Sequence, residues 1–101
     1  MSRIFGPIRQ LAMVVKDWEK AIHQWAEVGV GPFYVIDNFK PEVYRYRGVS
    51  MSGPVLTLCF AQSGPVQIEI IQQKDATPSA YMDFLSSGLE GCQHVCAWYG
   101  N

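Results

Sequence analysis

The chain has few charges and no long hydrophobic run, and each shortage excludes a class of partner. Only 17% of its 101 residues are charged and the net charge is −1, so no basic surface indicates binding to nucleic acid or to an anionic membrane. The longest purely apolar run, Leu11 to Val15, is far shorter than the about 20 residues of a membrane-spanning helix. We therefore expect neither a nucleic-acid partner nor a membrane partner.

Cysteine is also scarce, and the three cysteines do not form a disulfide framework. Cys92 and Cys96 fall in one predicted strand, where they are about 13 Å apart, too far for a disulfide. His94 lies between them on the same predicted strand face. Donors on one zinc ion must lie within about 4 Å of each other, so these three residues are not expected to bind one ion. The first seven residues lack the apolar segment of a secretory signal, and we expect a cytoplasmic protein.

Apolar residues, by contrast, are plentiful enough for one core. They make up 49% of the chain, and 101 residues predict a single domain over 1–101. Alternating patterns predict strands over 8–15, 33–36, 43–49, 55–61, 64–73 and 92–99. A helix is predicted after the cap residue Asp17, and a second, short one from Thr77-Pro78. This order predicts an α+β fold with a mostly antiparallel sheet.

One carboxylate interrupts the most strand-like stretch. In the strand over 64–73, alternation places Val66, Ile68 and Ile70 on a core face and Glu69 on the other face with Gln67. A buried carboxylate needs water, a partner or a metal ion. Exposure to solvent on the wet face of the sheet and a role in a functional site both remain open at this point.

The end of the chain repeats its beginning. Residues 94–101 show the same apolar pattern as residues 10–17 without a gap, and Asn101 falls where Asp17 is expected to cap the first helix. The chain therefore begins a second copy of its opening unit. A match this short is weak by itself.

Four segments carry a resemblance to a known family. They are Gln-Leu-Ala-Met-Val-Val-Lys-Asp-Trp-Glu-Lys-Ala from Gln10, Gly-Val-Gly-Pro-Phe from Gly29, Val-Gln-Ile-Glu-Ile-Ile-Gln from Val66 and Gly-Cys-Gln-His-Val from Gly91. In this order they resemble the vicinal oxygen chelate superfamily of glyoxalases, bleomycin-resistance proteins and extradiol dioxygenases. Methylmalonyl-CoA epimerase and glyoxalase-like proteins are nearest in pattern.

The resemblance implies a βαβββ module with a concave sheet. Residues 1–75 would be the first module, and residues 76–101 a linker helix followed by the first strand of an incomplete second module. Two such modules normally pair to form the cleft. Either two chains pair, as a homodimer, or the sequence is part of a longer protein.

The resemblance also implies a set of site residues. Family metalloenzymes bind a divalent metal through a His or Gln on each first strand and a Glu on each fourth strand. The matching residues here are Gln10, Glu69 and His94, with Glu69 also a candidate for catalytic proton transfer. The matching Glu of the second module is absent because the sequence ends first.

Three functions remain open on these grounds. The first is a divalent-metal-dependent isomerase, epimerase or lyase acting on a small oxygenated substrate. The second is a metal-free protein that binds or sequesters a small molecule. Its candidate substrate-binding residues are Tyr44, Tyr46, Phe60 and Trp98. The third is a truncated module with a vestigial site. The cofactor is one divalent metal ion in the first case and none in the others.

Overall fold

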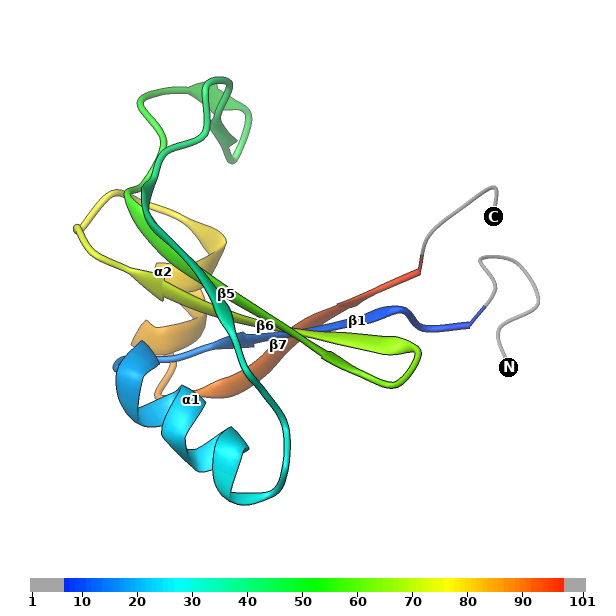
Figure 1. The fold of residues 1–101 in the computed structure, drawn as a ribbon. Coiled ribbons are helices and arrows are strands. Elements are labelled where there is room, and N and C mark those ends of the chain that lie inside the picture. Colours follow the sequence, from blue (N-terminus) through cyan, green and yellow to red (C-terminus); the bar gives the residue numbers. More distant parts are fainter. Residues whose placement is uncertain (1–6, 98–101) are drawn as a thin grey trace.

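The computed structural model describes residues 7–97, which form a five-stranded sheet, a two-stranded hairpin and two helices (Figure 1). The elements in chain order are β1 (Gln10–Val14), α1 (Trp18–Glu27), β2 (Tyr34–Phe39), β3 (Arg45–Tyr46), β4 (Val49–Ser50), β5 (Leu56–Ser63), β6 (Val66–Gln73), α2 (Ala80–Ser86) and β7 (Gly91–Cys96). The α+β class predicted from the sequence is confirmed.

The sheet has the strand order β2-β5-β6-β1-β7. Strand β1 runs parallel to β6, and the other three pairings are antiparallel. The predicted mostly antiparallel sheet is therefore confirmed, and β5 and β6 form an antiparallel hairpin within it. The chain crosses over through α1 between β1 and β2, and β7 returns to pair with the free side of β1 (Figure 1).

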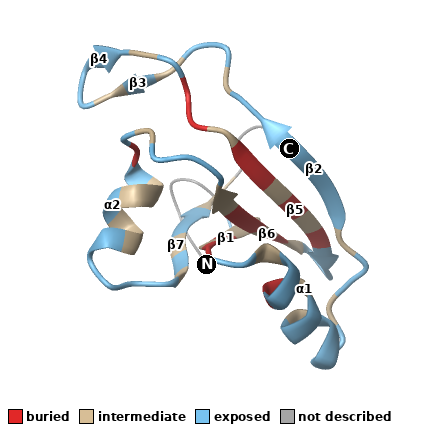
Figure 2. Ribbon diagram, turned by 90° about the vertical axis from the view of Figure 1, so that its left-hand side faces the viewer, coloured by how far each residue is buried: buried red, intermediate tan, exposed pale blue. Residues whose placement is uncertain are grey.

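Helix α1 covers one face of the sheet. Its predicted cap is confirmed, since the Asp17 side chain accepts a hydrogen bond of 3.1 Å from the backbone N–H of Lys20. Buried Ile68, Ile70 and Cys59 pack together beneath it. Many of the buried residues of the sheet lie on the neighbouring strands β5 and β6, whereas β2 at the sheet edge is exposed along its whole length (Figure 2). The face that alternation predicted as core is thus the α1 face.

Helix α2 covers part of the opposite face. Ala12, Val14 and Ile71 form a second buried cluster there, and Phe84 and Leu85 of α2 pack against it. This cluster lies where β1 and β6 end. Toward the other end of these strands the same face carries polar side chains such as Gln10 and Gln67, which are only partly buried. Helix α2 therefore leaves one end of this face open.

The last two residues of β6, Gln72 and Gln73, form side-chain hydrogen bonds at the N-terminal ends of α1 and α2. Because consecutive strand residues point to opposite faces, Gln72 reaches α1 and Gln73 reaches α2. The Gln72 side chain accepts a 2.8 Å hydrogen bond from the backbone N–H of Trp18. The Ser79 hydroxyl donates a hydrogen bond to the side-chain amide oxygen of Gln73. Ser79 also caps α2 by accepting from the N–H of Met82. The predicted start at Thr77-Pro78 is therefore two residues early.

Residues 43–49, predicted as a strand or ribbon, form most of the short hairpin β3–β4. Arg47 and Gly48 both adopt positive φ, 50° and 79°, which turns the chain back on itself as in a two-residue hairpin loop. The Tyr44 hydroxyl donates to the carbonyl of Pro78 at 2.7 Å, and the Tyr46 hydroxyl donates to the carboxylate of Asp83 on α2. These two hydrogen bonds join the hairpin region to α2 and to the segment just before α2.

Candidate functional site

The strand registers place the three predicted metal ligands on one face of the sheet. Ala12 on β1 pairs with Glu69 on β6 at one side and with His94 on β7 at the other. Paired residues share a face, and Gln10 is two residues before Ala12, so it lies on that face too. With strands about 4.8 Å apart, the Cα atoms of Glu69 and His94 are separated by about 10 Å across Ala12.

Two of these side chains are oriented by neighbouring glutamines. The Gln10 amide nitrogen donates a 2.6 Å hydrogen bond to the Gln67 side-chain oxygen, which leaves the Gln10 carbonyl oxygen as an acceptor. The Nδ1 atom of His94 contacts the side-chain oxygen of Gln93. A proton on Nδ1 leaves Nε2 unprotonated, which is the state in which an imidazole binds a metal.

Glu69 lies between aromatic and aliphatic neighbours. It pairs with Phe60 on β5 and with Ala12 on β1, and its side chain is half-buried. Burial raises the pKa of the Glu69 carboxyl above its ordinary value, because the charged form loses solvation. A cation beside this carboxylate would lower its pKa again, because the ionised form would gain an opposite charge.

A metal at this position would depend on the amide of Gln10. Among residues 7–97, no three His, Cys, Asp or Glu side chains are grouped closely enough to hold a metal ion. The donors that share the face are one carboxylate, one imidazole and one amide carbonyl. Oxygen and imidazole donors fit a hard or borderline divalent ion, so this donor set is compatible with the metal that the resemblance implies.

The structure corrects the predicted placement of one cysteine. Cys92, His94 and Cys96 were expected on one strand face, but the register of β7 shifts by one residue opposite Ala12 and Met13. Cys92 consequently pairs with Met13, which lies on the α1 face, whereas His94 pairs with Ala12 on the other face. An irregularity of this kind inverts the alternation of a strand. The Cys92 side chain therefore lies on the face opposite the His94 side chain, and its thiol instead contacts the His94 backbone carbonyl at 3.9 Å.

A hollow of about 570 Å³ opens beside His94, between the β3–β4 hairpin, α2 and β7. We call it the tyrosine hollow. Its lining includes Tyr44, Tyr46, Tyr81, Asp83, Gln93 and His94. Two of the predicted substrate-binding residues, Tyr44 and Tyr46, therefore line the same hollow as the predicted metal ligand His94.

The other two predicted substrate-binding residues are not in this hollow. Phe60 lines a separate depression of about 340 Å³ at the far end of β5, together with Tyr34 and Gln67. Its register partner is Glu69, so it belongs to the same sheet face as the candidate ligands. Trp98 lies outside the described residues 7–97.

Tyr81 is a site residue that the sequence pattern did not indicate. It lies on α2 and packs against the buried cluster around Ala12. It also lines the tyrosine hollow. Burial, and then the charge of Glu69, raise the pKa of the Tyr81 hydroxyl. The only sequence signal was a polar tip on an otherwise apolar stripe.

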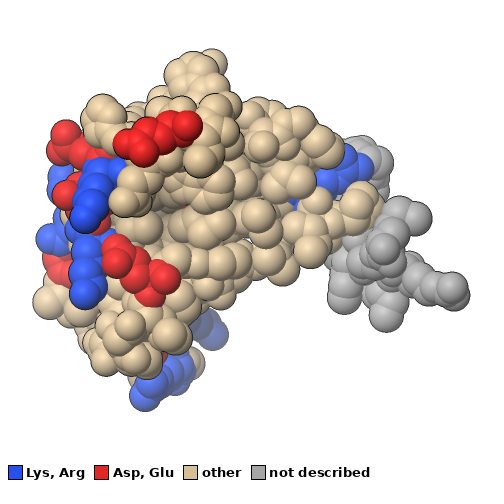
Figure 3. Space-filling model, turned by 90° about the horizontal axis from the view of Figure 1, so that it is seen from below, with Lys and Arg blue, Asp and Glu red and all other residues tan. Residues whose placement is uncertain are grey.

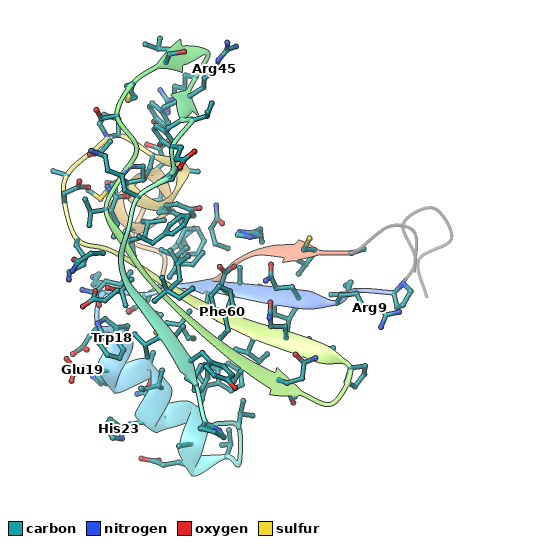
Figure 4. All side chains as sticks on the ribbon, turned by 45° about the horizontal axis from the view of Figure 1, so that its top comes forward. Arg9, Trp18, Glu19, His23, Arg45 and Phe60 are labelled. Carbon is teal, nitrogen blue, oxygen red and sulfur yellow. The ribbon has the colours of Figure 1, made fainter. Side chains whose placement is uncertain are left out.

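Charged side chains are unevenly distributed over the surface. Seen from below, most of the Lys, Arg, Asp and Glu side chains in view gather over one end of the molecule, and the rest of that view shows mainly uncharged residues (Figure 3). His23 and Glu19 project from the outer side of α1, as expected for solvated residues (Figure 4). No helix among the described residues is long and apolar enough to cross a membrane.

A family model described as Glyoxalase/Bleomycin resistance protein/Dioxygenase superfamily matches residues 9–101, which is almost the whole chain. No curated protein matches it.

Proposed function

This chain belongs to the glyoxalase/bleomycin resistance protein/dioxygenase superfamily, and from this premise we propose its function. The chain binds a small oxygenated molecule on the open sheet face, beside a divalent metal held by Gln10, Glu69 and His94. It acts on that molecule as an isomerase, epimerase or lyase. The observation that carries this proposal is the shared register, in which Ala12 stands between Glu69 and His94 and two residues from Gln10.

The chemistry divides between the ion and the protein. A bound divalent ion would supply Lewis-acid stabilisation of negative charge on a substrate oxygen. Glu69 would move a proton to or from the carbon beside that oxygen. A carboxylate within hydrogen-bond reach of a reacting group can act as a general acid or base. Gln67 and Gln93 would orient Gln10 and His94 through the bonds described above.

A second copy of the chain would complete the ligand set. Three protein donors, one of them an amide, bind a divalent ion weakly. Among residues 7–97, β7 has a neighbouring strand only on its β1 side, and an unpaired strand edge is suited to pairing with another chain. We propose a homodimer in which each chain contributes one module, in the cytoplasm.

Metal-free binding is the second candidate function. The tyrosine hollow supports it, because a cleft of about 570 Å³ with aromatic walls has the size and composition of a small-molecule site. In this case Gln10, Glu69 and His94 would contact the ligand directly.

Replacing His94 by alanine separates the two functions. We expect the wild-type protein to bind Mn²⁺ or Ni²⁺ in isothermal titration calorimetry and the His94→Ala variant to bind at least about 10-fold more weakly, since it lacks the imidazole donor. The matched control is His23→Ala, which removes the other histidine, exposed on α1. Equal metal binding by the two variants, or none by the wild type, would contradict a metal centre at this site.

A further inference from the structure

We propose that the tyrosine hollow binds a planar aromatic ring bearing a carboxylate or carbonyl oxygen, and that the Tyr81 hydroxyl donates a hydrogen bond to that oxygen. This proposal rests on the proposed small-molecule cleft and names its ligand class. It does not require the metal, so the two can fail separately.

The wall of the hollow is held by tyrosine hydroxyls that are already used. Tyr44 donates to the carbonyl of Pro78 and Tyr46 donates to the Asp83 carboxylate. With their hydroxyls directed at α2, these two residues present ring surface rather than hydrogen-bonding groups to a ligand. Aromatic side chains contact planar rings in stacked or edge-on arrangements. The hollow therefore favours a flat, unsaturated ligand over a saturated one.

Tyr81 supplies the polar group that the other two tyrosines lack. Among residues 7–97 its hydroxyl makes no side-chain hydrogen bond, and its ring is held by packing against the cluster that includes Ala12. Ala12 lies between Glu69 and His94 in the register. A ligand oxygen bonded to Tyr81 would lie in the hollow that His94 also lines. A tyrosine hydroxyl is protonated at neutral pH and can therefore donate this bond.

The charges around the hollow favour an anion over a cation. Arg47 is paired with Asp83 at 3.3 Å and lies over the Tyr46 ring, 5.0 Å from its centre, so these two charges offset each other. Arg45, the first residue of β3, also lines the hollow, and Figure 4 shows it at the end of the molecule where the hairpin lies. No ion pair of Arg45 is found among the described residues. A cation at the rim attracts anionic ligands and repels cationic ones.

Binding of three simple probes tests this ligand class in the presence of EDTA, which removes the metal from the comparison. Benzoate has the ring and the charge, cyclohexanecarboxylate has the charge without a flat ring, and benzylamine has the ring with the opposite charge. We expect benzoate to bind at least about 10-fold more tightly than either of the others, measured by calorimetry on the full chain.

Tyr81→Phe tests the hydrogen bond. The variant keeps the ring and its packing, so it should fold, which far-ultraviolet circular dichroism checks. We expect benzoate affinity to fall about 10-fold, the loss typical of a hydrogen bond to a charged group. Tyr34→Phe is the matched control, because Tyr34 is 81% exposed on β2 and lines the other depression.

The outcomes separate this proposal from the proposed metal site. Absence of benzoate binding, equal binding of benzoate and cyclohexanecarboxylate, or an equal loss in Tyr81→Phe and Tyr34→Phe would each overturn the proposal. Benzoate binding without any metal binding in the His94→Ala experiment would support it while contradicting the metal centre. Metal binding without benzoate binding would do the reverse.

Discussion

Replacing Ile70 by alanine is expected to lower the free energy of unfolding by about 2–5 kcal/mol, the usual cost of truncating a buried isoleucine. Ile70 has no exposed surface and lies in the middle of β6, paired with Cys59 on one side and Met13 on the other. Its side chain belongs to the cluster beneath α1. The cavity left by alanine would have to be closed by moving central strands, which are held from both sides.

Urea denaturation followed by circular dichroism measures this loss. A domain of this size has about 5–15 kcal/mol to lose, so the transition midpoint should fall markedly. The matched control is Ile36→Ala, because Ile36 lies on the edge strand β2 and is 47% exposed. We expect its cost to stay below about 1 kcal/mol, in proportion to the smaller buried area. Similar losses in the two variants would show that the core is not where the structure places it.

Replacing Glu69 by glutamine is expected to weaken divalent-metal binding by about 100-fold or more. It removes the only carboxylate of the proposed ligand set, whereas loss of a group that merely orients a ligand already costs about 10–100-fold. The comparison is made by titration with Mn²⁺, with Glu19→Gln as the control, since Glu19 is exposed on the outer side of α1 (Figure 4). Unchanged metal affinity in Glu69→Gln would remove this residue from the site.

The same variant should change how stability depends on pH. The pKa of Glu69 is raised in the folded protein, so its contribution to stability is present below the unfolded pKa of about 4.3 and is lost as the pH rises through the folded value. Glutamine resembles the protonated form at every pH. In EDTA, we therefore expect Glu69→Gln to gain stability relative to the wild type between about pH 4 and pH 7, measured by urea denaturation. If Glu69→Gln instead loses stability relative to the wild type as the pH rises over this range, the fold stabilises the ionised carboxylate.

The elements that the sequence predicted well are those that local patterns determine. Helix α1 has its apolar stripe and its Asp17 cap within a dozen residues, and the β5–β6 hairpin needs only alternation on both sides of a Gly-Pro turn. The α+β fold follows from these. Placement of Glu69 on the face opposite Ile68 and Ile70 was also predictable, because alternation has a period of two.

The candidate site needed information that no local pattern contains. Tyr46 reaches Asp83 across 37 positions in the sequence, and Tyr44 reaches Pro78 across 34, so the tyrosine hollow is formed by tertiary contacts. The register shift in β7 moved Cys92 to the other face, and nothing in the alternation of its residues indicates a bulge. The ring of Tyr81 packs against the buried cluster, as the ring of a core residue would. Only the position of α2 in the fold shows that Tyr81 also lines the tyrosine hollow.

The central claim is that Gln10, Glu69 and His94 hold one ion on a shared sheet face. Nuclear magnetic resonance of the isotopically labelled protein titrated with Mn²⁺ tests it most directly, because the paramagnetic ion broadens the signals of nearby nuclei. We expect the amide signals of Gln10, Ala12, Glu69 and His94 to disappear first, with those of Glu19 and His23 on α1 retained. Broadening centred on α1, or spread evenly over exposed carboxylates, would contradict the claim.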